Sequence, residues 1–280
     1  MLERFRAAKR PEIDRLQALG SKGALPAPLA GVRPSFSGAL RRGQPAGTGE
    51  AAGLAVAQAA GAPRTPSMAI IAEYKRASPS RGLIEGSVTP ENAAQAYARG
   101  GATAISVLTE ELHFRGELGF LARMTAPGLP LLRKDFIMHP LQVAATAATP
   151  ASAMLLIVRL TPDPAMLRDL REQAEAHGIE AVVEIFDEAE LAIARASGAR
   201  IIQVNARDLD TLKTDRTATL RLGPQRDAAE TWIAASGISA PEHLAAAQDA
   251  GYDAALVGTA LMQGGDLEGA LQNLLGRVQP

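Results

Sequence analysis

Eight short apolar runs alternate with longer amphipathic stretches from Ala69 onward, and this alternation restricts the possible folds more than any other feature of the sequence. The runs occupy residues 69–75, 102–109, 130–135, 153–159, 180–186, 199–205, 231–237 and 253–259. Strands that are apolar almost throughout are typical of a parallel sheet covered by helices. Eight strand–helix units predict an α/β fold in which the sheet closes into a (β/α)8 barrel, a TIM barrel.

A doubly wound sheet of six strands is the main alternative to a barrel. It would leave two of the eight runs without a place, and its first strand would lead into a Gly-rich dinucleotide-binding turn. Residues 76–82 read RASPSRG, which lacks that pattern. Helix start signals such as Thr89-Pro90 and Asp163-Pro164 fall between the runs, as a barrel requires.

Residues 1–66 differ from the rest of the chain. Leu2 to Leu19 predicts a helix, and a tract rich in Pro, Gly and Ala follows it. A barrel takes about 250 residues, so the 280 residues fit one barrel with an extension. We expect an N-terminal helical extension and linker over 1–66 and a barrel catalytic domain over 67–280. The low-complexity part, 43–66, is expected to be mobile on the substrate-binding side, and the alternative is an inert surface insertion.

The composition excludes several classes of function. With 29 Lys and Arg against 30 Asp and Glu, the chain has no charge excess to attract nucleic acid, and the absence of Cys excludes thiolate catalysis and disulfides. Residues 1–14 are charged where a signal peptide would be apolar, and no apolar run approaches the roughly 20 residues of a membrane span. We expect a cytoplasmic protein with a small-molecule substrate, without nucleic-acid or membrane partners, and compatible with a monomer. The four histidines lack the spacing of metal ligands, so no metal is expected.

Polar residues interrupt the apolar runs near their C-terminal ends, where barrel enzymes carry their functional side chains. These residues are Glu73, Lys75, Lys134, Glu184, Asn205, Arg207 and Ser236. Glu73 and Lys75 are two residues apart, so they share one face of a strand, whereas Arg133 and Asp135 should face away from Lys134. Because five strands contribute, we expect the polar residues to meet at one rim.

Each of these groups also has a purely structural interpretation. Glu73 and Lys75 could be an ion pair that fills the barrel, Lys134 could belong to a solvated charge cluster, and Glu184 could form an internal salt bridge. A carboxylate within an apolar strand is costly unless it is paired or protonated, and a lysine at a barrel rim can be an acid, a Schiff-base former or a phosphate anchor. The contribution of several strands to one rim favours a catalytic site.

Two glycine-containing strand ends predict a phosphate site. Ser236-Gly237-Ile238 ends the seventh run and Val257-Gly258-Thr259 ends the eighth. Glycine lets an anion approach backbone N–H groups, and the loops after the last two strands are the usual phosphate site of this fold. The alternative is that both glycines only serve turns. We expect a phosphorylated substrate.

Several segments together resemble the indole-3-glycerol phosphate synthase family of tryptophan biosynthesis. The most specific are IIAEYKRASPSRGLI (70–84) and LLRKDFIMHPLQ (131–142), and further matches follow in the family's order along the barrel. The resemblance implies a carbon–carbon lyase of the carboxy-lyase class. Such an enzyme closes a pyrrole ring on 1-(2-carboxyphenylamino)-1-deoxyribulose 5-phosphate, with loss of carbon dioxide and water and without a cofactor.

The resemblance also implies roles for individual residues. Lys134 would be the general acid of ring closure, Glu184 and Glu73 would handle the later proton transfers, and Lys75 would contact the phosphate or carboxylate and share the acid role during dehydration. Asn205 and Arg207 would orient the anthranilate carboxylate. The other substrate-binding residues would be Phe114 and Phe136 around the aromatic ring, Ser78, and Ser236, Gly237, Gly258 and Thr259, the last four mainly at the phosphate.

Three residues depart from the family pattern, and two other functions remain open beside the one that the resemblance implies. Ala235 stands where the family usually has Glu, Ala206 where it has Asn or Ser, and Phe186 where it often has His. A different phosphate-binding barrel, such as a phosphoribosylanthranilate isomerase, would not explain Lys134. A catalytically silent barrel that serves as a scaffolding subunit is favoured by Ala235 and opposed by Lys134 and Glu184.

Overall fold

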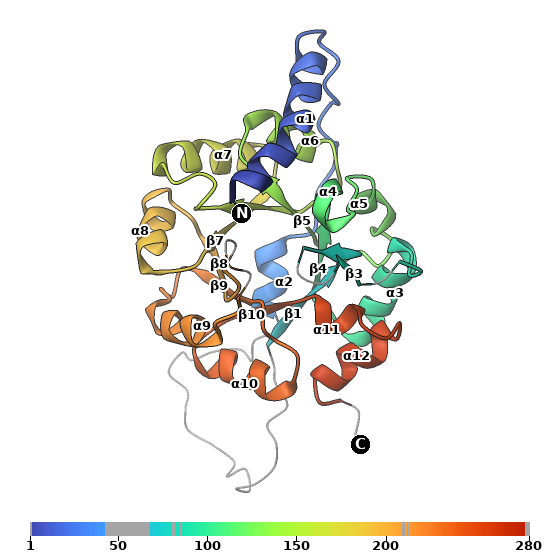
Figure 1. The fold of residues 1–280 in the computed structure, drawn as a ribbon, viewed down its shortest axis with the longest axis vertical. Coiled ribbons are helices and arrows are strands. Elements are labelled where there is room, and N and C mark those ends of the chain that lie inside the picture. The colour runs from blue at the N-terminus through green and yellow to red at the C-terminus, as the bar shows by residue number, and fades with distance from the viewer. Residues whose placement is uncertain are drawn as a thin grey trace, which may run out of the picture.

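The computed structural model describes residues 2–42, 68–79, 82–84, 86–208, 211 and 213–277. Eight parallel strands close into a barrel in the order β1-β10-β9-β8-β7-β6-β5-β4, surrounded by helices (Figure 1). The barrel strands are β1 (Ala69–Tyr74), β4 (Ala104–Leu108), β5 (Leu131–Ile137), β6 (Ala153–Ile157), β7 (Glu180–Ile185), β8 (Ile201–Asn205), β9 (Thr231–Ala235) and β10 (Ala254–Val257). The predicted (β/α)8 barrel is therefore confirmed, with strand ends within two residues of the predicted runs.

Helices follow the strands around the outside of the barrel. Between and after the barrel strands they are α3 (Pro90–Gly100), α4 (Glu111–Phe114), α5 (Phe120–Arg123), α6 (Pro140–Ala147), α7 (Pro164–Ala176), α8 (Glu188–Ala196), α9 (Arg216–Leu222), η1 (Gly223–Gln225), α10 (Pro241–Asp249), α11 (Thr259–Met262) and α12 (Leu267–Leu274). The predicted helix starts are confirmed, because α3 begins at Pro90 and α7 begins at Pro164. The side chains of the preceding residues, Thr89 and Asp163, each accept a hydrogen bond from a backbone N–H group of the helix. A short antiparallel hairpin, β2 (Ala77–Ser78) and β3 (Gly82–Leu83), follows β1.

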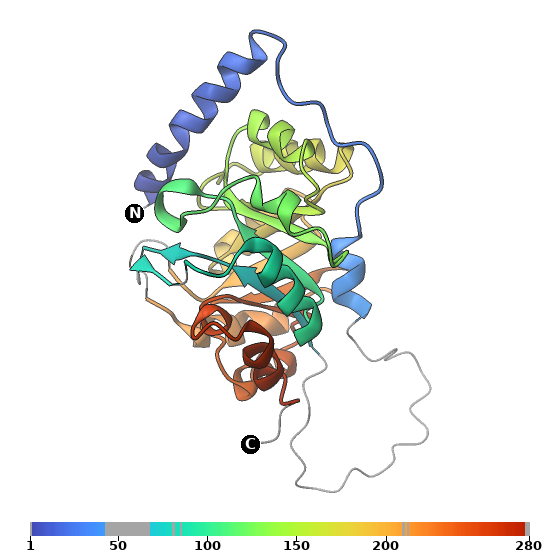
Figure 2. The same ribbon diagram turned by 90° about the vertical axis from the view of Figure 1, so that its right-hand side faces the viewer.

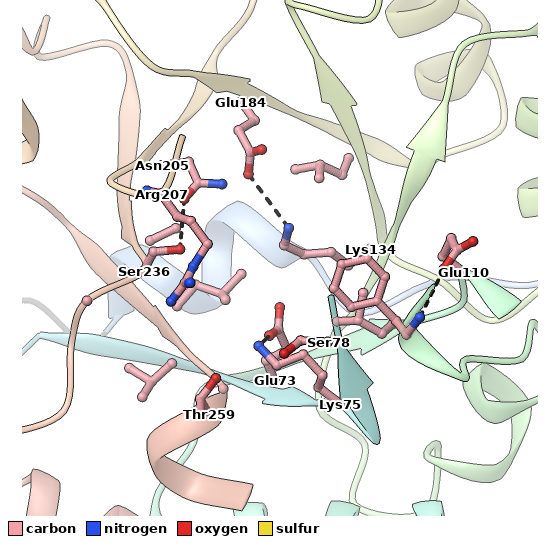
Figure 3. Close-up of a pocket in the computed structure, with 18 of the residues that line it drawn as sticks. Glu73, Lys75, Ser78, Glu110, Lys134, Glu184, Asn205, Arg207, Ser236 and Thr259 are labelled. Carbon is pink, nitrogen blue, oxygen red and sulfur yellow. Dashed lines mark hydrogen bonds and ion pairs between the residues drawn. The ribbon is translucent and has the colours of Figure 1, made fainter. Parts of the chain in front are cut away.

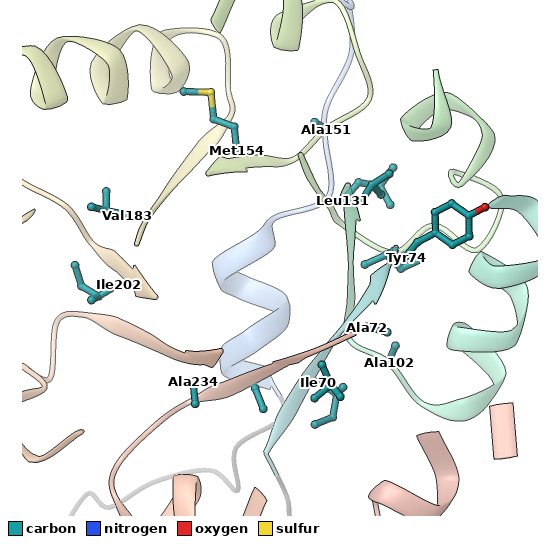
Figure 4. Packing of buried hydrophobic residues seen from close by; sticks show 14 of the residues in the cluster. Ile70, Ala72, Tyr74, Ala102, Leu131, Ala151, Met154, Val183, Ile202 and Ala234 are labelled. Carbon is teal, nitrogen blue, oxygen red and sulfur yellow. The ribbon is translucent and has the colours of Figure 1, made fainter. Parts of the chain in front are cut away.

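Side chains alternate between two separate apolar clusters along each strand. In β1, Ile70 and Ala72 belong to the outer cluster, which packs between the strands and the surrounding helices (Figure 4). Ala69 and Ile71 belong to the inner cluster, which fills the barrel. This alternation directs Glu73 to the inside at the end of the strand, where it lines a pocket.

The N-terminal extension places one helix at each end of the barrel. Figure 2 shows α1 (Leu2–Gly20) on the side of the β2–β3 hairpin and α4, and α2 (Phe36–Arg42) on the opposite side. The prediction of a helix over Leu2–Leu19 is confirmed. The sequence analysis did not predict α2, which lies in the tract rich in Pro, Gly and Ala.

Helix α2 closes the N-terminal end of the barrel. Phe36 and Leu40, four residues apart on one face, are fully buried in the inner cluster. Glu180, the first residue of β7, accepts hydrogen bonds from the N–H groups of Phe36 at 2.6 Å and Ser37 at 3.1 Å. Arg41 donates to Thr231 Oγ1, at the start of β9, at 3.1 Å.

The tract over 43–66, for which we expected mobility, lies outside the described residues. No helix in the described part of the chain is long and apolar enough to cross a membrane. The same residues contain no cluster of three or more His, Cys, Asp or Glu able to hold a metal ion.

Candidate active site

All thirteen residues predicted from the sequence line one pocket at the C-terminal rim of the barrel. They are Glu73, Lys75, Ser78, Phe114, Lys134, Phe136, Glu184, Asn205, Arg207, Ser236, Gly237, Gly258 and Thr259. In Figure 3, Lys134 lies between Glu184 on one side and Glu73 with Lys75 on the other. The convergence of strand ends that the sequence predicted is therefore present.

Glu73 and Lys75 form an ion pair inside the barrel mouth. Lys75 Nζ lies 2.7 Å from Glu73 Oε1, and Glu73 is almost completely buried. Burial alone would raise the pKa of Glu73, but the charges of Lys75, Lys134 and Arg207 and the hydrogen bond from Lys75 lower it below its ordinary value. Glu73 is therefore a carboxylate at neutral pH and able to accept a proton.

The absence of a side chain at Gly258 leaves room for the Glu73 carboxylate. A Cβ added at Gly258 would overlap Glu73 Oε1 and would lie 3.1 Å from the Cβ and Cδ of Glu73. Because the first and last strands of the barrel are paired at Ala72 and Val257, the backbones cannot separate to relieve this contact. From the sequence, Gly258 is expected mainly at the phosphate, and its contact with Glu73 is a second reason for glycine at this position.

Lys134 and Glu184 face each other across the pocket from β5 and β7. Lys134 Nζ lies 3.7 Å from Glu184 Oε2, which also accepts a hydrogen bond from Gln203 Nε2. Glu184 Oε1 is buried and has no hydrogen-bond partner among the described residues. Since Glu184 lines the pocket, that oxygen is a hydrogen-bond acceptor available to a bound molecule.

Asn205 connects two of the predicted binding loops. Its Oδ1 accepts a hydrogen bond from Ser236 Oγ at 2.7 Å and another from the N–H of Arg207 at 3.0 Å. These bonds orient the Asn205 amide so that its NH₂ end is directed away from its two donors. Asn205 and Arg207 both line the pocket, and an amide donor and a guanidinium are groups suited to binding a carboxylate.

The predicted phosphate end is formed by the loops after β9 and β10. Ser236 and Gly237 both have positive φ values, 70° and 77°, which turn the backbone sharply at the rim. A Cβ at Gly237 would lie 2.9 Å from Cγ of Arg216, so this position needs glycine both for its conformation and for its space. Glycine at this strand end leaves the backbone without a side chain, which allows an anion to approach its N–H groups closely.

An apolar wall closes the side of the pocket next to β5. Phe114 and Phe136 have ring centroids 6.1 Å apart, and Phe5 of α1 stacks on Phe136 at 4.2 Å. Phe5 also packs edge-on against His113. Phe5 was not predicted from the sequence, because the periodicity of α1 does not indicate which part of the barrel the helix covers.

Glu110 is a second pocket residue that the sequence analysis missed. It accepts hydrogen bonds from the N–H groups of His113 at 2.7 Å and Phe114 at 3.0 Å, and it thereby begins α4. Glu is not among the residues that usually cap helices, and α4 has only four residues, so the sequence carries no clear signal for this role. Glu110 thus holds Phe114 in place.

Comparison with known proteins assigns the family. The family model described as indole-3-glycerol phosphate synthase matches residues 56–274. The chain belongs to this family. It is 44% identical over 213 residues to the indole-3-glycerol phosphate synthase of Mycolicibacterium smegmatis, covering 76% of this chain and 78% of the relative. It is 42% identical over 226 residues to that of Mycobacterium leprae, covering 80% and 83%.

More distant solved structures share the fold with this indole-3-glycerol phosphate synthase family member. A 3-hexulose-6-phosphate synthase from Salmonella typhimurium matches with a TM-score of 0.58 at 16% identity, over 75% of this chain and 97% of that one. An N-acetylmannosamine-6-phosphate 2-epimerase from Clostridium perfringens matches with a TM-score of 0.53 at 18% identity, over 69% and 86%. These likenesses concern the barrel alone.

The three departures from the family pattern are all buried. Ala235 lines the pocket, and Ala206 and Phe186 are buried next to it. The Arg159 guanidinium lies 4.1 Å from the centroid of the Phe186 ring and is hydrogen-bonded to Asp208 at 2.8 Å. Phe186 therefore supports an arginine that ties the end of β6 to the loop after β8.

Proposed function

We propose that this chain closes the indole ring of indole-3-glycerol phosphate from 1-(2-carboxyphenylamino)-1-deoxyribulose 5-phosphate, with release of carbon dioxide and water. The observation that carries the proposal is the pairing of Lys134 with Glu184, 3.7 Å apart, in a pocket that also holds the Glu73–Lys75 pair. Ring closure needs an acid for a carbonyl oxygen, and dehydration needs an acid and a base. The pocket holds two ammonium groups and two carboxylates for these tasks.

Lys134 acts in the first step of the proposed reaction. The ring carbon that bears the carboxylate attacks the ribulose carbonyl carbon, and the Lys134 ammonium donates a proton to the carbonyl oxygen. The carboxylate then leaves as carbon dioxide, and the electrons of the broken bond restore the aromatic ring. Phe114 and Phe136 pack around this ring, which fits their place in the apolar wall.

Glu184 and Glu73 act in the later proton transfers. The hydroxyl formed in the first step leaves as water, and a proton is removed from the neighbouring carbon to complete the pyrrole. Glu184 has one unpartnered buried oxygen for this purpose, and Glu73 is kept ionised by the surrounding cations. Lys75 contacts the phosphate or carboxylate and shares the acid role.

The remaining predicted residues bind the two anionic ends of the substrate. Asn205 and Arg207 orient the anthranilate carboxylate, and Ser78 completes the binding surface. The phosphate lies against Ser236, Gly237, Gly258 and Thr259, which line the pocket after β9 and β10 and include two glycines that allow an anion to approach backbone N–H groups.

The experiment that tests this function uses the purified chain and the carboxyphenylamino-deoxyribulose phosphate. Indole fluorescence should rise with time and saturate with substrate, and a Lys134→Met variant under the same conditions serves as the control. A chain that binds the substrate but gives no indole signal would refute the proposal.

We further propose that the protein acts in the cytoplasm as a monomer, without a cofactor or a nucleic-acid partner. The near balance of charge supports the absence of a nucleic-acid partner. We keep 1–66 as an extension with its linker and 67–280 as the catalytic barrel. Light scattering of the purified protein and activity after dialysis against a chelator test the oligomeric state and the absence of a metal cofactor.

A further inference from the structure

Four charged side chains form a buried cluster behind the candidate acid Lys134. Lys9 and Glu12 come from α1, and Arg133 and Asp135 flank Lys134 on β5. Lys9 Nζ lies 2.8 Å from Asp135 Oδ1, Arg133 lies 2.9 Å from Glu12 and 2.8 Å from Asp135, and Lys9 also pairs with Glu12. Lys9, Arg133 and Asp135 are each at most 4% exposed.

The cluster lies where the barrel sheet is irregular. Between Arg133 and Ile137 the pairing of β5 with β6 shifts register, so the regular ladder is interrupted around Lys134. An interruption of this kind lets a strand redirect a side chain, but it also removes the hydrogen bonds that would hold the strand in place. Lys134 is still paired with Leu108 of β4, so it is the side of β5 toward β6 that needs another support.

The charged cluster supplies that support on both sides of Lys134. Asp135 accepts a hydrogen bond from the N–H of Phe136 at 2.8 Å and from Thr109 Oγ1 at 2.6 Å. The N–H of Thr109 in turn donates to the carbonyl oxygen of Lys134 at 3.1 Å. Arg133 donates to the carbonyl oxygen of Gln142 at 3.2 Å, which ties the same stretch to α6.

Removing these charged groups from water costs desolvation free energy, which a purely structural contact between apolar groups would not require. Burial would raise the pKa of Asp135, but Arg133 and Lys9 hold it well below the ordinary range of a carboxyl, so the group is ionised. Apolar side chains can hold a helix on a barrel without this desolvation cost, and Phe5 already does so through its stack on Phe136. What hydrogen-bonded charges add is a fixed direction for the atoms they bind.

We propose that Lys9 and Glu12 are positioning residues that reach from α1 to set the geometry of Lys134 at the interruption of β5. Lys9 holds Asp135 and Glu12 holds Arg133, so the backbone before and after Lys134 has one orientation. The inference rests on the proposed function, in which Lys134 is the acid of ring closure. Neither α1 residue touches the pocket, so neither acts on the substrate directly.

The test compares Lys9→Met with Arg10→Met, which changes an exposed cation on the same helix. Because a displacement of about 1 Å can cost on the order of a hundredfold in rate, we expect Lys9→Met to lower kcat by about tenfold or more, with KM within about threefold. Glu12→Gln should lower kcat by less, since an amide oxygen can still accept from Arg133. Arg10→Met should leave kcat and KM unchanged, and Lys9→Arg should restore part of the lost kcat.

A second variant separates positioning from stability. Lys9→Met with Asp135→Asn removes both charges of the Lys9–Asp135 pair and the Asp135 charge that faces Arg133, and it leaves Arg133 paired with Glu12. We expect its melting temperature to exceed that of Lys9→Met while kcat stays low. Recovery of kcat together with the melting temperature would overturn the proposal, as would a folded Lys9→Met enzyme with wild-type kcat. If the wild-type chain itself gave no indole product, the proposed function would fail first, so the two failures are distinguishable.

Discussion

Gly258→Ala provides a sharp test of how the barrel mouth is built. The new methyl group would overlap Glu73 Oε1 and would lie 3.1 Å from two other atoms of the same side chain. The strands on which the two residues lie are held together by pairing, so the Glu73 carboxylate must rotate away. Rotation breaks the 2.7 Å contact between the carboxylate and Lys75 Nζ. It also moves the carboxylate away from the cations that lower the pKa of Glu73.

The expected size of the effect follows from the contacts that are lost. A hydrogen bond to a charged group contributes about 1.5–3 kcal/mol and a displaced rotamer costs about 0.5–1.5 kcal/mol, which gives a loss of about 2–4.5 kcal/mol in the free energy of unfolding. Removing a positioned proton-transfer group typically lowers the rate by about 10²–10⁴. We therefore expect kcat to fall by about a hundredfold and the melting temperature by several degrees.

Steady-state kinetics and thermal melting measure the two effects separately. Gly86→Ala is the matched control, because a Cβ there would meet only methyl carbons of Leu83 at 3.7 Å. Loss of phosphate binding at Gly258 would raise KM and weaken inhibition by inorganic phosphate, whereas loss of Glu73 acts on kcat. A Gly258→Ala enzyme with kcat within threefold of wild type, whatever its KM, would refute this reasoning.

Four further substitutions test the other parts of the molecule. Lys134→Met should lower kcat by about 10²–10⁴ with KM within about tenfold in steady-state assays, and retention of a tenth of the wild-type turnover would exclude it as the acid. Glu184→Gln should let a ring-closed intermediate accumulate in single-turnover traces, and unchanged traces would argue against its role. Gly237→Val should abolish competition by inorganic phosphate, since its side chain meets Arg216 and its backbone has a φ of 77°; normal substrate binding would contradict the phosphate site. Glu180→Ala should lower the free energy of unfolding by about 1–3 kcal/mol through the lost cap of α2, while kcat and KM stay unchanged; a fall in kcat would show that α2 also affects the rim.

Local patterns sufficed to predict the barrel and most of the candidate site. The runs of Val, Ile and Leu are apolar because strands of a covered parallel sheet are buried on both faces, and the burial of Ile70 and Ile71 on opposite faces of β1 shows this directly. Lys134 and Glu184 were recognisable because burying a charged side chain within an apolar strand costs free energy, so such a residue usually has an ion-pair partner or a functional role. Strand direction then placed both at the same rim.

The parts that could not be predicted depend on contacts between distant segments. Lys9 and Glu12 look like ordinary solvated charges three residues apart on a charged helix, and only Arg133 and Asp135 make them a buried cluster. Phe5 is one apolar residue among many until α1 is placed against Phe136. The short helix α2 has too few residues for a periodic signal, and its burial depends on the open end of the barrel.

The anchoring of the N-terminal extension has a consequence for the order in which the chain folds. The partner of Glu12 is 121 residues further along the chain, and the carbonyl groups of Leu160 and His177 that bind Arg6 and Arg33 are 154 and 144 residues beyond those arginines. During synthesis, which proceeds from the N-terminus, α1 therefore leaves the ribosome long before any of these groups exists, and an isolated helix of 19 residues is only marginally stable in water. Helix α1 is thus made before the strands and loops that it binds but can be fixed only after them, and the loop closures that this requires slow the docking of the helix.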